Sequence, residues 1–101
     1  WTYGAPGSTL CWWEPKSPEF VYAVETAFGT RYYTVDEDNC NKVYEVEINK
    51  PSLVNAGTFH STYNPTQEGR WTFTMPLLDA TTKKRLAWDD AVERFKGYII
   101  K

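Results

Sequence analysis

The residues of this chain that could carry chemistry are its two cysteines, its one histidine and a few acidic and basic side chains. Cys11 and Cys40 are separated by 28 residues. In the chain-entropy description, a bond that closes a loop of this length stabilises a domain by about 3.5 kcal/mol. A chain of 101 residues buries only a modest core, so such a bond would supply a large share of its stability. We therefore predict a disulfide between Cys11 and Cys40, with two buried free thiols as the alternative.

His60 is the side chain type that most often serves as a general base. A hairpin made from residues 58–63 and 70–75 would bring Glu68 and Arg70 across from it, as an acid and an anion clamp. A small ribonuclease needs such a set. A partly exposed surface histidine is the simpler interpretation, so the sequence favours a non-enzymatic protein over this enzyme.

Ligands for a metal ion are scarce in the sequence. With one histidine and both cysteines in a disulfide, a structural zinc site lacks ligands. Asp36, Asp38 and Glu47 match three positions of a calcium-binding loop, but Cys40 and Asn41 stand where an oxygen ligand and a glycine belong. We interpret this segment as an acidic turn. Phosphate-binding loops and nucleophile elbows are absent from the sequence, and we expect no metal and no cofactor.

Aromatic residues are the unusual feature of the composition. Five Trp, seven Tyr and five Phe are more than a core of this size needs, so some should face outward. Neighbouring residues in a strand point to opposite faces, which would expose one side chain of the Trp12–Trp13 pair. Trp71 and Trp88 lie on apolar faces and are expected to be buried. The candidate binding residues are Trp12, Trp13, Tyr32 and Tyr63.

Alternating apolar and polar residues predict that most of the chain forms strands. The expected strands cover residues 9–14, 20–28, 30–35, 42–49, 58–63 and 70–75. Gly29 should turn the second strand into the third as a hairpin. Trp88, Val92, Phe95 and Ile99 share a helical face, which predicts a helix over residues 87–96 that Gly97 ends in the left-handed conformation, before a short strand over residues 98–100.

Together these patterns predict one α+β, β-rich domain over residues 1–101. About six mostly antiparallel strands would form a sandwich or half-barrel, held by one disulfide and covered by a C-terminal helix. The net charge of −2 argues against nucleic acid as a partner, and the chain has no long apolar run for a membrane. The chain begins with Trp1, which fits a processed product or an excised domain, and the predicted disulfide favours a secreted protein.

Two segments resemble the MAX effectors, small secreted fungal proteins. These segments are Leu10-Cys11-Trp12-Trp13, a hydrophobic strand that begins at a cysteine, and the turn Asp36-Glu37-Asp38-Asn39-Cys40. The resemblance implies a six-stranded double sheet with one disulfide and a host protein as the partner. The sequence therefore suggests a secreted, effector-like protein that binds a protein partner, outside the cell or after translocation into a host, through a sheet edge and aromatic residues. The alternatives are a carbohydrate-binding module and a ribonuclease-like enzyme that uses His60, Glu68 and Arg70.

Overall fold

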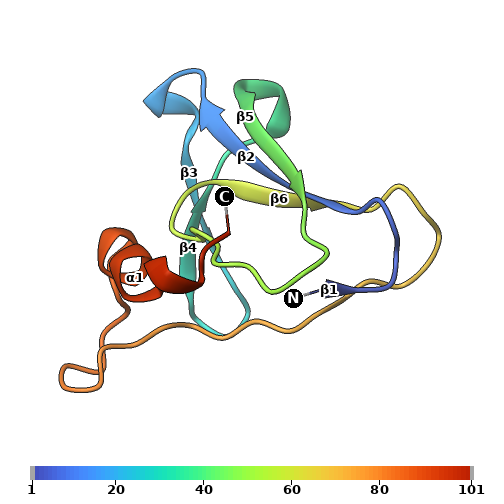
Figure 1. The fold of residues 1–101 in the computed structure, drawn as a ribbon. Helices are drawn as coiled ribbons and strands as arrows, with labels where there is room; N and C mark the ends of the chain where they lie inside the picture. The colour runs from blue at the N-terminus through green and yellow to red at the C-terminus, as the bar shows by residue number, and fades with distance from the viewer. Residues whose placement is uncertain (1, 101) are drawn as a thin grey trace.

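The centre of the molecule is a three-stranded antiparallel sheet in the order β5-β2-β6 (Figure 1). The strands are β2 at Thr9–Pro15, β5 at Cys40–Glu47 and β6 at His60–Tyr63. The computed structural model describes residues 2–100, so Trp1 and Lys101 of the predicted domain lie outside it. The middle strand is the most buried of the three because it is covered along both edges, and Leu10 and Cys11 lie in the core.

A β-bulge interrupts the pairing of β2 with β5. Trp12 lies opposite Tyr44 and Trp13 lies opposite Lys42, so Val43 is an extra residue without a partner on β2. A bulge of this kind bends its strand and increases the local twist. The bulge lies on β5, directly opposite the two neighbouring tryptophans of β2.

Two smaller antiparallel pairs complete the strands of residues 2–100. The hairpin joins β3 at Tyr22–Glu25 to β4 at Arg31–Thr34, and a ribbon joins β1 at Thr2–Tyr3 to β7 at Trp71–Thr72. The predicted hairpin around Gly29 is confirmed, and Gly29 has a φ of 77°. The antiparallel, β-rich class is also confirmed, but the strands form three small sheets rather than one sandwich or half-barrel.

Proline shortens one of the predicted strands. The expected strand over 20–28 is reduced because the 3-10 helix η1 takes Pro18–Phe20, with Pro18 at its first position. A proline ring fixes the backbone in a conformation that suits the first turn of a helix. A second 3-10 helix, η2 at Glu37–Asn39, forms the acidic turn just before β5.

The C-terminal helix is present where the sequence predicts it. The helix α1 covers Trp88–Phe95, buries Ala91 and lies on the opposite side of the molecule from β1 (Figure 1). The prediction that Gly97 ends it in the left-handed conformation is wrong, because the chain continues into the 3-10 helix η3 at Lys96–Tyr98 and Gly97 is not among the residues with positive φ. This 3-10 turn also takes part of the segment expected as a last strand.

The predicted disulfide is not formed, and both thiols are free and buried. Strand register explains why. Cys11 lies opposite Glu45, whereas Cys40 lies opposite Pro15, four positions further along β2. Four positions correspond to about 13 Å along a strand, which is well beyond the roughly 7 Å between Cα atoms that a disulfide can join. The expectation of secretion depended on this bond and loses that support.

The turn after Leu78 is held by one carboxylate. Asp79 Oδ1 accepts hydrogen bonds from the backbone N–H groups of Thr81 and Thr82, both at 2.8 Å, and a bridge pairs Leu78 with Arg85. The N–H groups of Thr82 and Thr81 lower the pKa of Asp79 below its ordinary 3.8, with a smaller contribution from Arg94, whose Nη2 lies 3.8 Å away.

We expect the pKa of Asp79, followed by NMR of its carboxyl carbon, to lie below 3.8. Because the folded-state pKa is lowered, the stabilisation is complete above pH 3.8 and is lost as the pH falls through the folded value. In the Arg94→Gln variant, the pKa of Asp79 should stay below 3.8, because the backbone N–H groups of Thr81 and Thr82 remain. A return to 3.8 in that variant would show that the ion pair is the main cause.

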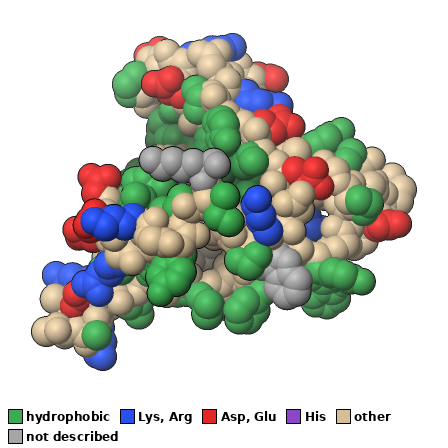
Figure 2. Space-filling view, in the orientation of Figure 1, with side chains coloured by type: hydrophobic (Ala, Val, Ile, Leu, Met, Phe, Trp, Pro, Cys, Tyr) green, Lys and Arg blue, Asp and Glu red, His purple; other side chains and the backbone are tan. Residues whose placement is uncertain are grey.

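The molecule leaves much apolar surface exposed. Of residues 2–100, only five hydrophobic ones are buried, and the solvent-accessible surface is 8449 Å². A monomeric protein of 11.7 kDa typically exposes about 5,900 Å². Figure 2 shows hydrophobic side chains over much of one face. Trp71, expected in the core, is 76% exposed on the short ribbon, and Trp88 is also exposed. This surface is available to a partner.

Candidate functional site

A cleft of about 840 Å³ lies between the β3–β4 hairpin and the central sheet. One wall is formed by residues 32–35, from β4 and the residue after it, and the other by residues 56–61, which lead into β6. Trp13, Val21, Glu37 and Cys40 also line the cleft. Its volume is within the range of pockets that hold small molecules or a few residues of a peptide.

The strand β4 presents its edge to this cleft. Successive side chains of a strand point to opposite faces, so the consecutive strand residues Tyr32, Tyr33 and Thr34 can all line one cleft when the strand lies edge-on to it. The other edge of β4 is paired with β3. The edge that lines the cleft is therefore the unpaired one.

The register of the hairpin identifies which backbone groups point into the cleft. The N–H of Thr26 donates to the carbonyl of Thr30 at 2.8 Å, which makes this pair a hydrogen-bonded one. Hydrogen-bonded and non-hydrogen-bonded pairs alternate in an antiparallel ladder, so Tyr32, opposite Val24, bonds to β3. Tyr33, the next residue, directs its N–H and C=O away from β3 and toward the cleft.

Hydrogen bonds fix the opposite wall onto the central sheet. The N–H of Trp13 donates to the carbonyl of Phe59 at 3.0 Å, and the indole Nε1 of Trp13 donates to Ser61 Oγ at 2.8 Å. Before this wall, Asn55 Oδ1 accepts the N–H of Gly57 at 3.2 Å and closes a turn. The wall is therefore held in place before any ligand binds.

Three side chains of the cleft, those of His60, Glu37 and Cys40, are of the types that carry acid–base or nucleophilic chemistry. His60 Nδ1 donates to the carbonyl of Thr58 at 2.7 Å, in the tautomer that leaves Nε2 as an acceptor for a ligand. Glu37 brings a carboxylate. Burial raises the pKa of the Cys40 thiol above its ordinary 9.0, and the carboxylates of Asp36 and Glu37 add to this while Lys16 opposes it. The thiol is therefore a weak nucleophile at neutral pH.

The structure brings together only some of the predicted binding residues. Trp13, Tyr32 and His60 line the cleft. Trp12 does not: its ring lies 5.8 Å from that of Tyr44 and its Nε1 donates to the carbonyl of Asn55 at 3.0 Å. Tyr63 is exposed at the far end of β6 and also lies outside the cleft.

The hairpin that would assemble the ribonuclease set does not form. The strand with His60 pairs with β2, and β7, which follows Arg70, pairs with β1. Glu68 lies in the intervening loop, where its carbonyl accepts a hydrogen bond from Asn64 Nδ2 at 2.8 Å. The Nε of Arg70 is buried without a hydrogen-bond partner. Strand pairing therefore gives no support to a joint catalytic role for these three residues.

Glu37, Tyr33 and Phe59 belong to the cleft but are not among the binding residues predicted from the sequence. The sequence does contain a signal for Tyr33, because this second aromatic residue follows Tyr32 in the predicted strand over residues 30–35. Glu37 and Phe59 carry no local signal, since they join the cleft only through the packing of segments distant in the chain.

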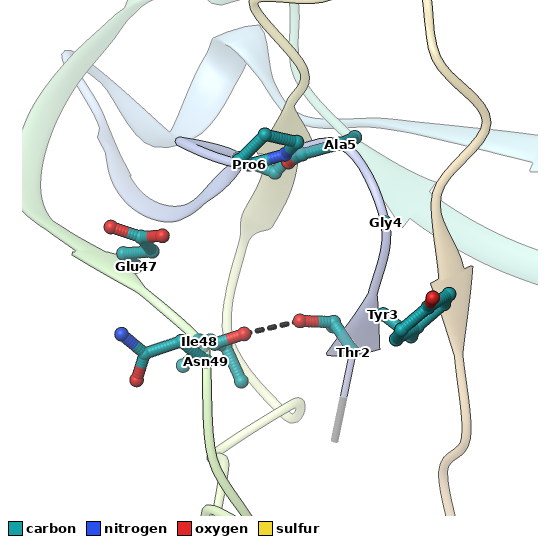
Figure 3. A pocket seen from close by; sticks show the side chains of 9 residues that line it. Thr2, Tyr3, Gly4, Ala5, Pro6, Glu47, Ile48 and Asn49 are labelled. Atoms are coloured by element: carbon teal, nitrogen blue, oxygen red, sulfur yellow. Dashed lines mark hydrogen bonds between the residues drawn. The ribbon is translucent and has the colours of Figure 1, made fainter.

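A second cavity, of about 310 Å³, lies beside the β1–β7 ribbon. Figure 3 shows the hydroxyl of Thr2 directed at the carbonyl of Ile48, to which it donates a hydrogen bond, with Glu47 and Asn49 on the same wall as Ile48. Among the described residues that line it, only Tyr3 is aromatic. The larger cleft offers more rings and an open strand edge, and it is the better candidate.

Residues 2–100 contain no group of three His, Cys, Asp or Glu side chains placed to hold a metal ion. The candidate calcium ligand Asp36 instead accepts a hydrogen bond from the hydroxyl of Tyr22 at 2.9 Å. Among the same residues, no helix is long and apolar enough to cross a bilayer.

The free thiols give a direct prediction. Protein purified without reductant should release two reactive thiols per chain when it is unfolded, because Cys11 and Cys40 are unpaired. In the folded protein, Cys40 should react slowly until the pH exceeds 9.0. A chromogenic thiol reagent measures both. Two thiols that become reactive only after reduction would show that the cysteines are bonded.

Comparison of the chain with protein-family models, with characterised proteins and with solved structures finds no match.

Proposed function

We propose that this chain is a non-enzymatic binding protein that holds an extended segment of a partner protein in the cleft between β4 and residues 56–61. The observation that carries the proposal is the unpaired edge of β4 along an aromatic-lined cleft. Such an edge offers a row of backbone donors and acceptors, and a peptide that adds as a strand satisfies them.

The walls of the cleft suit a strand that binds in this way. Trp13, Tyr32, Tyr33 and Phe59 supply apolar area for alternate side chains of the peptide. The wide apolar surface of the whole molecule agrees with a protein that works in contact with another. The resemblance to the MAX effectors suggests a host protein as the source of the segment, in a secreted, effector-like role.

Two variants at Tyr33 test the mode of binding. Tyr33→Pro removes the N–H that would pair with the peptide, and β3 does not use this N–H, so the hairpin should survive. Tyr33→Ala removes the same ring but keeps the N–H. Against short extended peptides in isothermal titration calorimetry, the proline variant should bind about five- to tenfold more weakly than the alanine variant.

Circular dichroism of both variants serves as the control for folding. Equal affinities of the two variants, both folded, would show that the edge of β4 does not pair with the ligand. Failure of the parent chain to bind any peptide of a broad panel would overturn the proposal itself.

Carbohydrate is the second candidate, and the half-exposed rings in the cleft favour it. Tyr32 is 50% exposed and Tyr33 is 64% exposed, and the hydroxyls of Thr34 and Ser61 lie in the same cleft. Rings stack on the apolar faces of sugars, and hydroxyls bond to their edges. Retention of the protein on insoluble polysaccharide, lost in Tyr32→Ala, would support this function over peptide binding.

A further inference from the structure

The charge of the cleft limits what it can bind. Among the residues that line it, Glu37 is the only one with a formal charge when His60 is neutral. Within residues 2–100, the salt bridges join Lys42 to Glu45, Arg94 to Asp79 and Lys96 to Glu93. The carboxylate of Glu37 is therefore in none of these ion pairs and interacts only at longer range with Lys42, so a ligand meets its negative charge in the cleft.

The rings of the cleft already attract cations. The guanidinium of Arg31 lies 5.8 Å from the centre of the Tyr33 ring, and Lys42 Nζ lies 5.5 Å from the centre of the Trp13 ring. Both distances are within the range of cation–π attraction. Neither Arg31 nor Lys42 lines the cleft.

We propose that the cleft selects a lysine or arginine side chain of the bound segment, with Glu37 as its counter-ion and the rings of Trp13, Tyr32 and Tyr33 around it. This inference depends on the proposed peptide-binding function and names the chemistry of the partner. A carboxylate beside several aromatic faces is the arrangement that recognises organic cations. The net charge of −2 also favours a basic partner.

Positive charges near the cleft oppose the binding of a lysine or arginine side chain to different degrees. Lys42 is neutralised by Glu45, whose carboxylate lies 2.5 Å from its Nζ. Lys16 Nζ donates to the backbone carbonyl of Asp38 at 2.9 Å. This carbonyl leaves the charge of Lys16 in place, and that charge acts on the thiol of Cys40 in the cleft. Arg31 is exposed, is likewise in none of the ion pairs of residues 2–100, and lies against the ring of Tyr33. Removing the charge of Arg31 should tighten the binding of a cation.

The experiment compares two peptides of the same length. One alternates Thr and Lys, and the other has every lysine acetylated, which removes the charge but keeps the side chain. In titration calorimetry at low salt, the charged peptide should bind about tenfold more tightly. Glu37→Gln should remove most of this preference, and Arg31→Gln should increase it about two- to threefold.

Asp38→Asn is the matched control, because it removes the same charge from the same turn at a residue that does not line the cleft. It should leave the preference nearly unchanged. Equal binding of the two peptides, or an equal loss in both acidic variants, would overturn the selection of a cation while the proposed peptide-binding function stands. Binding of neither peptide would overturn both.

Discussion

The Leu10→Ala variant should unfold with a free energy about 2–3 kcal/mol below that of the parent chain. Leu10 lies in the middle strand of the central sheet, between Val46 and Thr62, and is 8% exposed. Removing three buried carbon atoms loses their transfer free energy and leaves a cavity that the neighbouring strands cannot close fully. A loss of this size is a large part of the stability of a small domain, whose core here contains few buried residues.

Leu78 offers the matched control, because the same substitution there removes the same atoms from a side chain that is 51% exposed. Leu78→Ala should cost less than about 1 kcal/mol. Denaturant unfolding, followed by tryptophan fluorescence, measures both variants. Equal losses would mean that the strand order β5-β2-β6 does not describe the core.

The Gly4→Ala variant should lower the free energy of unfolding by about 2–4 kcal/mol. Gly4 has a φ of 80°, and an added Cβ would lie 2.6 Å from the backbone carbonyl oxygen of Gly69. Gly4 directly follows β1, and Gly69 lies two residues before the start of β7, so relief of the clash requires the ribbon that these strands form to separate. Backbone atoms at this distance cannot move aside as a flexible side chain would.

Gly29→Ala is the control that separates the effect of the clash at Gly4 from the free-energy cost of a left-handed backbone conformation. Gly29 has nearly the same φ, 77°, but no atom lies within 4 Å of its added Cβ. Gly29→Ala should therefore cost only about 1–2 kcal/mol, the ordinary cost of an L-residue in the left-handed region. Thermal and denaturant unfolding of the two variants should differ. If Gly4→Ala lowered the free energy of unfolding no more than Gly29→Ala, then Gly4 and Gly69 would not lie as close together as described.

Local pattern predicted the parts of this fold that depend on neighbouring residues. The alternation around Gly29 gives the hairpin, and the shared face of Trp88 and Val92 gives the helix. Period-two alternation also predicts β5 and β6. It cannot give strand order, because both edges of β2 are open to any strand of suitable pattern. The pairing of β6 with β2 is therefore new information from the structure.

The predicted disulfide failed for a related reason. Loop-closure entropy gives the stabilisation that a bond between Cys11 and Cys40 would contribute, but it contains no information on strand register. In the fold, register places the two cysteines four positions apart along β2. The prediction that Gly97 ends the helix in the left-handed conformation was wrong because the chain continues as a 3-10 turn after the helix.

The candidate site could be predicted only in part. Trp13, Tyr32 and His60 were identified as exposed aromatic or polar residues of strands, and all three line the cleft. The cleft itself forms where residues 32–35 pack near residues 56–61, and the sequence contains no signal for that contact. Trp12 was expected to bind, but its indole N–H is taken by the carbonyl of Asn55.

Chemical-shift mapping by NMR tests the peptide-binding proposal most directly. Amide signals of the ¹⁵N-labelled protein would be followed while the peptide of alternating Thr and Lys is added. We expect the largest changes in residues 32–35 and 56–61 and in the indole N–H of Trp13, with the amide of Tyr33 protected from hydrogen exchange in the complex. Changes confined to the β1–β7 ribbon or the helix α1, or no changes at all, would contradict binding at this cleft.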